Sequence, residues 1–181
     1  KADASVPEDT ESVSGRVAYS FLDKEGYLTR STYLGSKDIM TIGYTFMKQS
    51  DAFGDESATT DFSASNIDFL LEKNLADGSV ATVEAALYDY DEFGAASKEG
   101  DATMVSLAYM PDGIFGLGRL QASVRYQEFS PDDNSDDTTR VDVGLTSLIK
   151  GHGARVGIYF ADQETGSSST ETIKLGIQLK L

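Results

Sequence analysis

Hydrophobic and polar residues alternate along most of this chain, and the C-terminus shows the pattern most clearly. Within residues 171–181 the apolar positions are Ile173, Leu175, Ile177, Leu179 and Leu181. Polar residues or glycine occupy the positions between them. Alternation with a period of two places the two kinds of residue on opposite faces of a β-strand. This segment is therefore predicted to form a strand with one apolar and one polar face.

The same alternation recurs upstream and predicts nine strands in total. They are expected within residues 15–22, 39–47, 67–73, 80–88, 103–110, 119–127, 139–150, 151–164 and 171–181. Residues 27–35 alternate poorly and are a candidate tenth strand. No apolar run approaches the roughly 20 residues of a membrane-spanning helix. The chain is predicted to be all-β.

The predicted connections alternate between two kinds. One kind is short and rich in glycine or asparagine, which favour the positive-φ positions of tight turns; these are residues 74–78, 110–118 and 150–153. The other kind is longer and acidic, with Lys98 as its only cation; these are residues 50–61, 89–101, 128–139 and 162–171. This alternation predicts an antiparallel up-and-down sheet that is trimmed at one end and elaborated at the other.

Strand length and the placement of charge favour a membrane barrel. The predicted strands match the about 9 to 11 residues that cross a bilayer at a tilt. Charged residues fall on the polar face, and the apolar face carries aromatic residues near strand ends: Tyr44, Phe46, Tyr109, Tyr126 and Phe160. Lipid offers no hydrogen bonds, so strands cross it only as a closed barrel. The predicted fold class is a transmembrane antiparallel up-and-down β-barrel of nine or ten strands, with its apolar faces toward lipid.

Composition narrows the partners and the domain organisation. The chain has 181 residues and a formal net charge of −15, so a nucleic-acid partner is not expected, because the polyanion would be repelled. The absence of Cys excludes a disulfide scaffold and a thiolate metal site. Residues 1–13 are predicted to be a polar N-terminal segment, from which any export signal has been removed. Residues 14–181 are predicted to be the barrel domain.

Two stretches resemble a known family. Residues 147–164, "SLIKGHGARVGIYFADQE", followed by "ETIKLGIQLKL", are similar to the closing hairpin of Gram-negative outer-membrane porins, including the phosphate-selective porin O/P relatives. Residues 15–46 are similar to a stretch in the C-terminal half of the same proteins. Family members have about sixteen or more strands, so the resemblance implies that this chain is part of a larger barrel of 16–18 strands or a reduced version. The family usually ends on an aromatic residue, whereas this chain ends on Leu181.

The polar face contains the candidate pore-lining residues. They are Glu84, Arg119, Arg125, Arg140, Asp142, Arg155, Lys174 and Lys180. The basic members cluster from residue 119 onward. Cations on neighbouring strands that face the lumen would form an array, and such arrays make pores selective for anions. The alternative is that they pair with Asp142, Glu84 or loop acids and only keep this face polar.

No residue pattern indicates catalysis. His152 is the only histidine and lies in a predicted tight turn, where we expect a structural role. Residues 132–137, "DDNSDD", begin like a calcium loop but lack its glycine and its final glutamate. The acidic loops are either merely solvated or bind divalent cations shared with lipopolysaccharide phosphates. We expect no enzyme activity, no cofactor and no dedicated metal site.

These features predict a porin of the bacterial outer membrane. It would form a water-filled pore for passive diffusion of small hydrophilic solutes or ions, with a weak preference for anions. Expected partners are membrane lipid and lipopolysaccharide, small solutes or anions, and, as one candidate assembly, a homotrimer. One alternative is a non-conducting structural barrel or a sheath around a partner protein such as a cytochrome. Another is a soluble β-clam that encloses the apolar faces.

Overall fold

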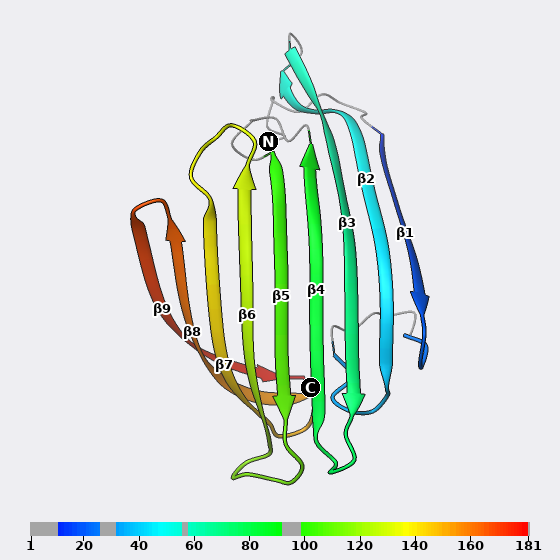
Figure 1. The fold of residues 1–181 in the computed structure, drawn as a ribbon, viewed down its shortest axis with the longest axis vertical. Helices are drawn as coiled ribbons and strands as arrows, with labels where there is room; N and C mark the ends of the chain where they lie inside the picture. The colour runs from blue at the N-terminus through cyan, green and yellow to red at the C-terminus, as the bar shows by residue number, and fades with distance from the viewer. Residues whose placement is uncertain (1–10, 26–31, 56–57, 92–98, 181) are drawn as a thin grey trace.

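The structure is a computed structural model of the chain and describes residues 11–25, 32–55, 58–91 and 99–180. The regular elements of these residues are β-strands in one sheet (Figure 1). They are β1 (Ser12–Ser20), β2 (Ile39–Asp55), β3 (Ala58–Asn74), β4 (Val80–Asp91), β5 (Gly100–Met110), β6 (Arg119–Pro131), β7 (Thr138–Leu148), β8 (Ala154–Thr165) and β9 (Ser168–Leu179). The nine strands predicted from alternation are confirmed. The described residues contain no helix long and apolar enough to span a membrane.

The strands follow one another through the sheet in chain order, as the up-and-down prediction requires. Every neighbouring pair is antiparallel. Within the described residues β1 and β9 each pair with a single neighbour, so the sheet has two open edges. Because direction reverses at each step, these two edge strands run in the same direction. Figure 1 shows the sheet as a curved wall in which β8 and β9 sweep round at one end.

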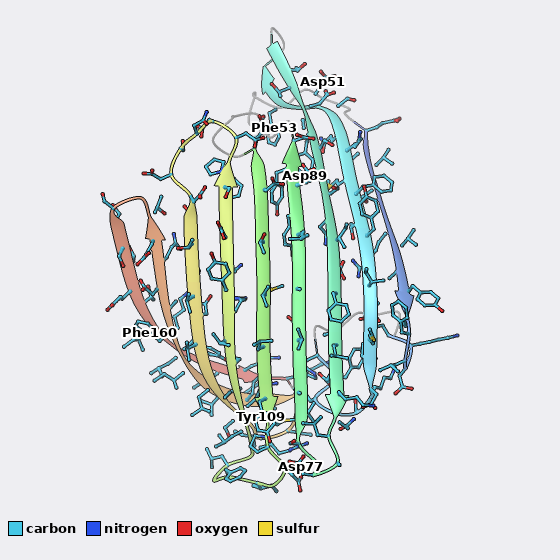
Figure 2. All side chains as sticks on the ribbon, in the orientation of Figure 1. Asp51, Phe53, Asp77, Asp89, Tyr109 and Phe160 are labelled. Atoms are coloured by element: carbon cyan, nitrogen blue, oxygen red, sulfur yellow. The ribbon has the colours of Figure 1, made fainter. Side chains whose placement is uncertain are left out.

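The connections alternate between the two ends of the sheet. We call the end that holds residues 21–25, 32–38, 75–79, 111–118 and 149–153 the turn end, and the opposite end the loop end. Figure 2 shows Asp77 and Tyr109 at the turn end and Asp51 and Asp89 at the loop end.

The predicted extent of two long loops, residues 50–61 and 162–171, is wrong because strands occupy most of both. β8 and β9 continue to Thr165 and from Ser168, so most of residues 162–171 is strand. β2 and β3 extend to 17 residues each across the predicted loop at 50–61, with a bulge between Gln49 and Phe53. These segments lack apolar alternation but keep their backbone hydrogen bonds, which sequence periodicity does not register. Residues 56–57 and 92–98 of the predicted long loops lie outside the described residues, and so do residues 1–10 of the predicted N-terminal segment.

The apolar parity of the strands faces outward. Its members are exposed on the convex side, from Val17 at 76% on β1 to Leu175 at 81% on β9. The polar parity lies on the concave side, where crowding buries Thr41, Thr82 and Thr146 although the described chain has only this one sheet. An exposed apolar face of this extent is compatible with strands that face a membrane. The soluble β-clam predicted the opposite arrangement, with the apolar parity enclosed, and this sheet does not have it.

Tyr159 shows how the concave face is filled. Its side chain lies over two glycines: a Cβ added at Gly144 would lie 2.6 Å from Cδ1 of the ring, and one added at Gly157 would lie 2.6 Å from the hydroxyl. Its hydroxyl lies 2.8 Å from Oγ1 of Thr146. The glycines on the polar parity therefore leave room for an inward aromatic side chain.

A small hydrophobic cluster lies on the concave face at the turn end. Val80, Met110 and Leu148 are buried there, and Leu34 packs against them. Leu34 belongs to the candidate tenth strand, of which residues 27–31 lie outside the described residues. The described part, 32–35, is not a strand but an inward-folded turn, so the prediction is wrong there. Its poor alternation reflects packing of one apolar side chain against the sheet, not membership of it.

Candidate pore-lining site

The predicted site residues share the concave face. Glu84, Arg119, Arg125, Arg140, Asp142, Arg155 and Lys174 all alternate with exposed apolar residues on their own strands. Lys180 follows β9 and is exposed, with its backbone N–H donating to the carbonyl of Gly153 at 2.7 Å. The topology thus gathers residues from β4 and β6 to β9 along one wall.

Asp142 is the centre of the best-defined cluster. Arg140 donates from Nε and Nη2 to its two carboxylate oxygens at 3.0 and 2.8 Å. Arg125, directly opposite on β6, donates from Nη2 at 3.1 Å. For these two arginines the ion-pair alternative is therefore what the structure contains. One carboxylate between two guanidinium groups still leaves an excess positive charge.

Arg119 and Arg155 have other contacts. Nη2 of Arg119 lies 3.2 Å from the carbonyl of Gly78 and 3.4 Å from that of Pro111, so this arginine ties two turns together. Arg155 donates from Nε to the side-chain oxygen of Gln178 at 2.8 Å. Neither makes an ion pair within the described residues.

Glu84 and Lys174 lie on either side of the Asp142 cluster. Glu84 is opposite Ser106 of β5, which is in turn opposite Arg125 of β6, so it faces the cluster from two strands away. Lys174 is exposed on the edge strand β9, opposite Tyr159.

Strand register places the cations at successive heights. Arg119 and Arg155 share the lowest row, on either side of Leu148. Lys174 lies in the row of Ser123, Arg125 in the row above and Arg140 in the row of Gln127. At about 3.3 Å per residue, the rows from 119 to 127 cover roughly 26 Å of strand. The cations thus form a staircase along the strands, and only its upper part is paired with a carboxylate.

The turn end of the concave face holds a feature that the sequence did not reveal. Residues 32–38 fold inward between the ends of the strands. Leu34 and Gly35 have φ of 55° and 79°, and these consecutive left-handed residues turn the chain onto the face. Glu72, which is 0% exposed, accepts the N–H of Tyr33 at 3.0 Å and that of Gly35 at 2.7 Å. Nε2 of His152 donates to the carbonyl of Thr32 at 2.9 Å.

A second carboxylate fastens the other end of this segment. Asp38 forms an ion pair with Lys73 and accepts hydrogen bonds from the backbone and side-chain nitrogens of Asn74 at 2.9 and 3.0 Å. The hydrogen bond from Lys73, followed by those from Asn74, lowers the pKa of Asp38 to about 2. We call residues 32–38 the inward segment. Its only sequence signals are apolar Val80, Met110 and Leu148 at polar-parity positions.

The described residues of the loops form no evident site for divalent cations. Across residues 11–25, 32–55, 58–91 and 99–180, no three carboxylate or histidine side chains are grouped so as to hold a metal ion. In the loop of residues 132–137, Asp133 accepts hydrogen bonds from Ser135, and these lower its pKa. The Asp133 carboxylate thus stabilises the turn to which it belongs.

Comparison with known proteins adds no relative. No protein-family model matches the chain, and it matches neither a curated protein nor a solved structure. The residues and their geometry are thus what any proposal of function has to rest on.

Proposed function

We propose that this chain forms part of the wall of a porin-type β-barrel in a bacterial outer membrane, through which small hydrophilic solutes and ions diffuse with a weak preference for anions. The observation that supports the proposal most is the division of the sheet into an exposed apolar face and a polar, cation-bearing concave face. Passive diffusion needs no catalytic group and no cofactor, and the proposal includes neither.

The outer face has the dimensions of a lipid-facing band. On β9 the apolar residues run from Ile173 to Leu179, roughly 20 Å at about 3.3 Å per residue. Bacterial barrels have an apolar band about 25 Å tall. On β4 the outer parity is apolar up to Leu87 and then becomes Asp89 at the loop end. A charged residue at that height fits a boundary between acyl chains and lipid headgroups.

Closure of the barrel would require further strands. β1 and β9 run in the same direction, so a direct pair between them would be parallel. Antiparallel closure needs an odd number of additional strands, and a total of roughly 16 or 18, as in porins, leaves an odd remainder after these nine. The proposal therefore places this sheet within a larger barrel, in line with the resemblance to porin O/P relatives. A homotrimer and contact with lipopolysaccharide belong to the same proposal.

The anion preference rests on the staircase of cations. Arg119, Arg155 and Lys174 line the wall without a carboxylate partner among the described residues. Fixed positive charge along a polar wall lowers the energy of an anion at each step and raises that of a cation. The loop end is strongly acidic, and its repulsion of anions keeps the expected preference weak.

Planar-bilayer recording tests the proposal. The purified protein should give discrete conductance steps. In a salt gradient, the sign of the reversal potential should show that anions permeate more readily than cations. The double change Arg125→Glu and Arg155→Glu should move that potential toward cation selectivity. Lys48→Glu, a single charge reversal at an exposed site of the convex parity, is the control. Conductance with an unchanged potential in the double variant would remove the anion preference, and no conductance at all would remove the pore.

A non-conducting structural barrel or sheath is a second candidate, and the inward segment favours it. Residues 32–38 cover part of the concave face at the turn end, where a narrow lumen would be obstructed. The variants that release the segment separate the two candidates. If Glu72→Gln turns a silent wild-type protein into a conducting one, the segment is a plug.

A further inference from the structure

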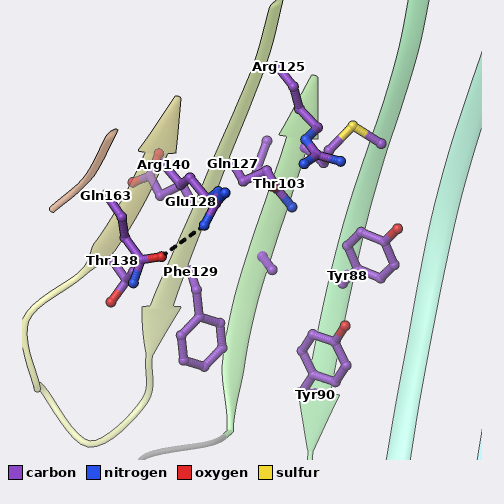
Figure 3. A pocket seen from close by; sticks show the side chains of 12 residues that line it. Tyr88, Tyr90, Thr103, Arg125, Gln127, Glu128, Phe129, Thr138, Arg140 and Gln163 are labelled. Atoms are coloured by element: carbon purple, nitrogen blue, oxygen red, sulfur yellow. Dashed lines mark hydrogen bonds between the residues drawn. The ribbon is translucent and has the colours of Figure 1, made fainter. Parts of the chain in front are cut away.

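A hollow of about 480 Å³ lies on the concave face toward the loop end (Figure 3). Strands β4 to β8 contribute its lining, and these strands are consecutive neighbours in the sheet. Its existence therefore depends neither on closure of a barrel nor on conductance. A ligand site in this hollow would be a property separate from the proposed pore.

Aromatic side chains surround a small residue at one end of the hollow. Ala102 of β5 lies opposite Tyr88 on β4 and opposite Phe129 on β6. The rings of Tyr88 and Tyr90 are parallel, with an angle of 7° between them and centroids 6.0 Å apart. Figure 3 shows both rings side by side and nearly face-on. The methyl group of Ala102 leaves space above the sheet, and the rings offer a flat apolar surface beside it.

Hydrogen-bond donors lie at the other end. Arg125 uses Nε and Nη2 on Asp142, while its Nη1 has no hydrogen-bond partner among the described residues. Its side chain is 47% exposed. Gln127 lies one row nearer the rings, and its amide likewise has no partner in the described part of the chain. Each side-chain nitrogen of Arg140, also at the rim, already donates to Asp142 or Gln163.

The charged groups on the concave face beside the hollow include a cationic donor that could bind an anion. Arg125 and Arg140 share the single carboxylate of Asp142. Glu128 contributes to the lining, but it belongs to the convex parity, where its carboxylate accepts a hydrogen bond from the hydroxyl of Tyr126 at 2.6 Å. Glu84, on the same face, attracts Arg125 electrostatically from two strands away, but the two form no ion pair. Nη1 of Arg125 is therefore the charged donor that remains at the end of the hollow away from the rings.

We propose that this hollow binds a flat aromatic monocarboxylate. The aromatic ring stacks on Tyr88 and Tyr90 above Ala102, and the carboxylate accepts hydrogen bonds from Nη1 of Arg125 and from the amide of Gln127. Arg125 and Phe129 are four positions apart on β6, roughly 13 Å between Cα atoms. Gln127 lies midway, roughly 7 Å from Phe129 between Cα atoms, which is about the length of a benzoate ion. Aromatic stacking selects the flat ring, and the guanidinium selects the charge.

Equilibrium dialysis of labelled benzoate against the full chain in detergent micelles tests the site directly. Benzoate should bind saturably, and benzyl alcohol and cyclohexanecarboxylate should compete at least several-fold more weakly. The first competitor lacks the charge and the second lacks the flat ring. This ligand series uses the wild-type protein, so it holds even if a variant fails to fold.

Two variants then locate the binding. Arg125→Gln should raise the Kd for benzoate about tenfold, because a hydrogen bond to a charged group is lost. Tyr88→Leu should raise it several-fold through loss of stacking. Lys48→Gln, which also removes one positive charge, and Tyr44→Leu make comparable changes at exposed sites of the convex parity and should leave the Kd unchanged. Micelle-only dialysis corrects for partition of the ligand.

The proposal is overturned if benzoate shows no saturable binding, if cyclohexanecarboxylate binds as well as benzoate, or if Arg125→Gln and Tyr88→Leu bind as wild type does. Because binding is measured without a membrane, its failure and the failure of conductance are independent results. Binding without conductance would keep this site and remove the pore.

Discussion

Glu72 and His152 bind the two ends of one peptide group. The N–H of Tyr33 donates to Glu72 on β3, and the carbonyl of Thr32 in the same peptide unit accepts from Nε2 of His152 in the β7–β8 turn. In a flat sheet β3 and β7 would be roughly 19 Å apart, at about 4.8 Å per strand. Two side chains can reach one peptide only because the sheet curves around it. The inward segment and the curvature of the wall are thus coupled.

Replacing Glu72 by Gln should loosen the inward segment. The buried carboxylate accepts two backbone N–H groups, whereas an amide offers one oxygen, so the loss is expected at about 1–3 kcal/mol. Hydrogen exchange of the Tyr33 and Gly35 amides should accelerate. Glu171→Gln, at an exposed site on β9, should change neither the free energy of unfolding nor the exchange of these amides. Unaltered exchange at residues 33–35 would show that Glu72 does not hold the segment.

Leu34→Ala tests the hydrophobic side of the same attachment. Leu34 is half-buried against Val80, Met110 and Leu148, so truncation should lower the free energy of unfolding by about 2 kcal/mol, the low end for buried leucines. Urea unfolding of the detergent-solubilised protein measures it. Leu117→Ala removes a leucine that is 71% exposed, and should change stability by less than about 0.5 kcal/mol. Equal effects of the two changes would contradict the packing described for Leu34.

The contact of Asp38 with Lys73 and Asn74 should make stability depend on pH in the acid range. Its pKa in the folded protein is about 2, below the ordinary value of 3.8. A lowered pKa means that the unfolded chain binds the proton first. The stabilisation is therefore complete above about pH 4 and is lost as the pH falls through the folded value.

The unfolding midpoint as a function of pH checks this expectation. Wild type should be more stable than Asp38→Asn by a constant margin above pH 4, and the two curves should converge toward pH 2. Lys73→Gln removes the main partner and should shrink the margin. A difference that grows as the pH falls would have the wrong sign for a lowered pKa.

Asp142→Asn should strengthen the preference for anions. The change removes the one carboxylate shared by Arg125 and Arg140, so both guanidinium groups face the concave side without an ion-pair partner. The reversal potential in a salt gradient should shift further toward anions, with the conductance retained. Asp137→Asn, in the exposed β6–β7 loop, is the control of equal charge. A shift toward cations would contradict the placement of this cluster on the wall of a pore.

The strands and their two faces could be predicted because both follow from the alternation of apolar and polar residues along the chain. Alternation such as Ile173, Leu175 and Ile177 against Lys174 and Gly176 marks a strand and separates its faces whatever the rest of the chain does. The gathering of Arg125, Arg140 and Asp142 was also foreseeable in outline, since they share one parity on neighbouring strands. Which of these cations would pair with a carboxylate was not foreseeable, because pairing depends on the register of the strands. A slip of one residue exchanges the two faces.

The inward segment lay beyond sequence reasoning for a similar cause. Tyr33, Leu34 and Gly35 have no periodic pattern, and their partners Glu72 and His152 are distant along the chain. The only trace of it in the sequence is that Val80, Met110 and Leu148 are apolar residues on a polar parity, and this does not identify what packs against them.

By itself, then, the sequence determined the strands, their order of reversal and the face that each side chain takes, because neighbouring residues in a strand must point to opposite sides. Tertiary structure decided how strongly the sheet curves and what its hollow side encloses. Curvature brings β3 and the β7–β8 turn to the same peptide, and it sets Tyr88, Ala102 and Phe129 beside one another across three strands. Such contacts join residues that no local pattern relates.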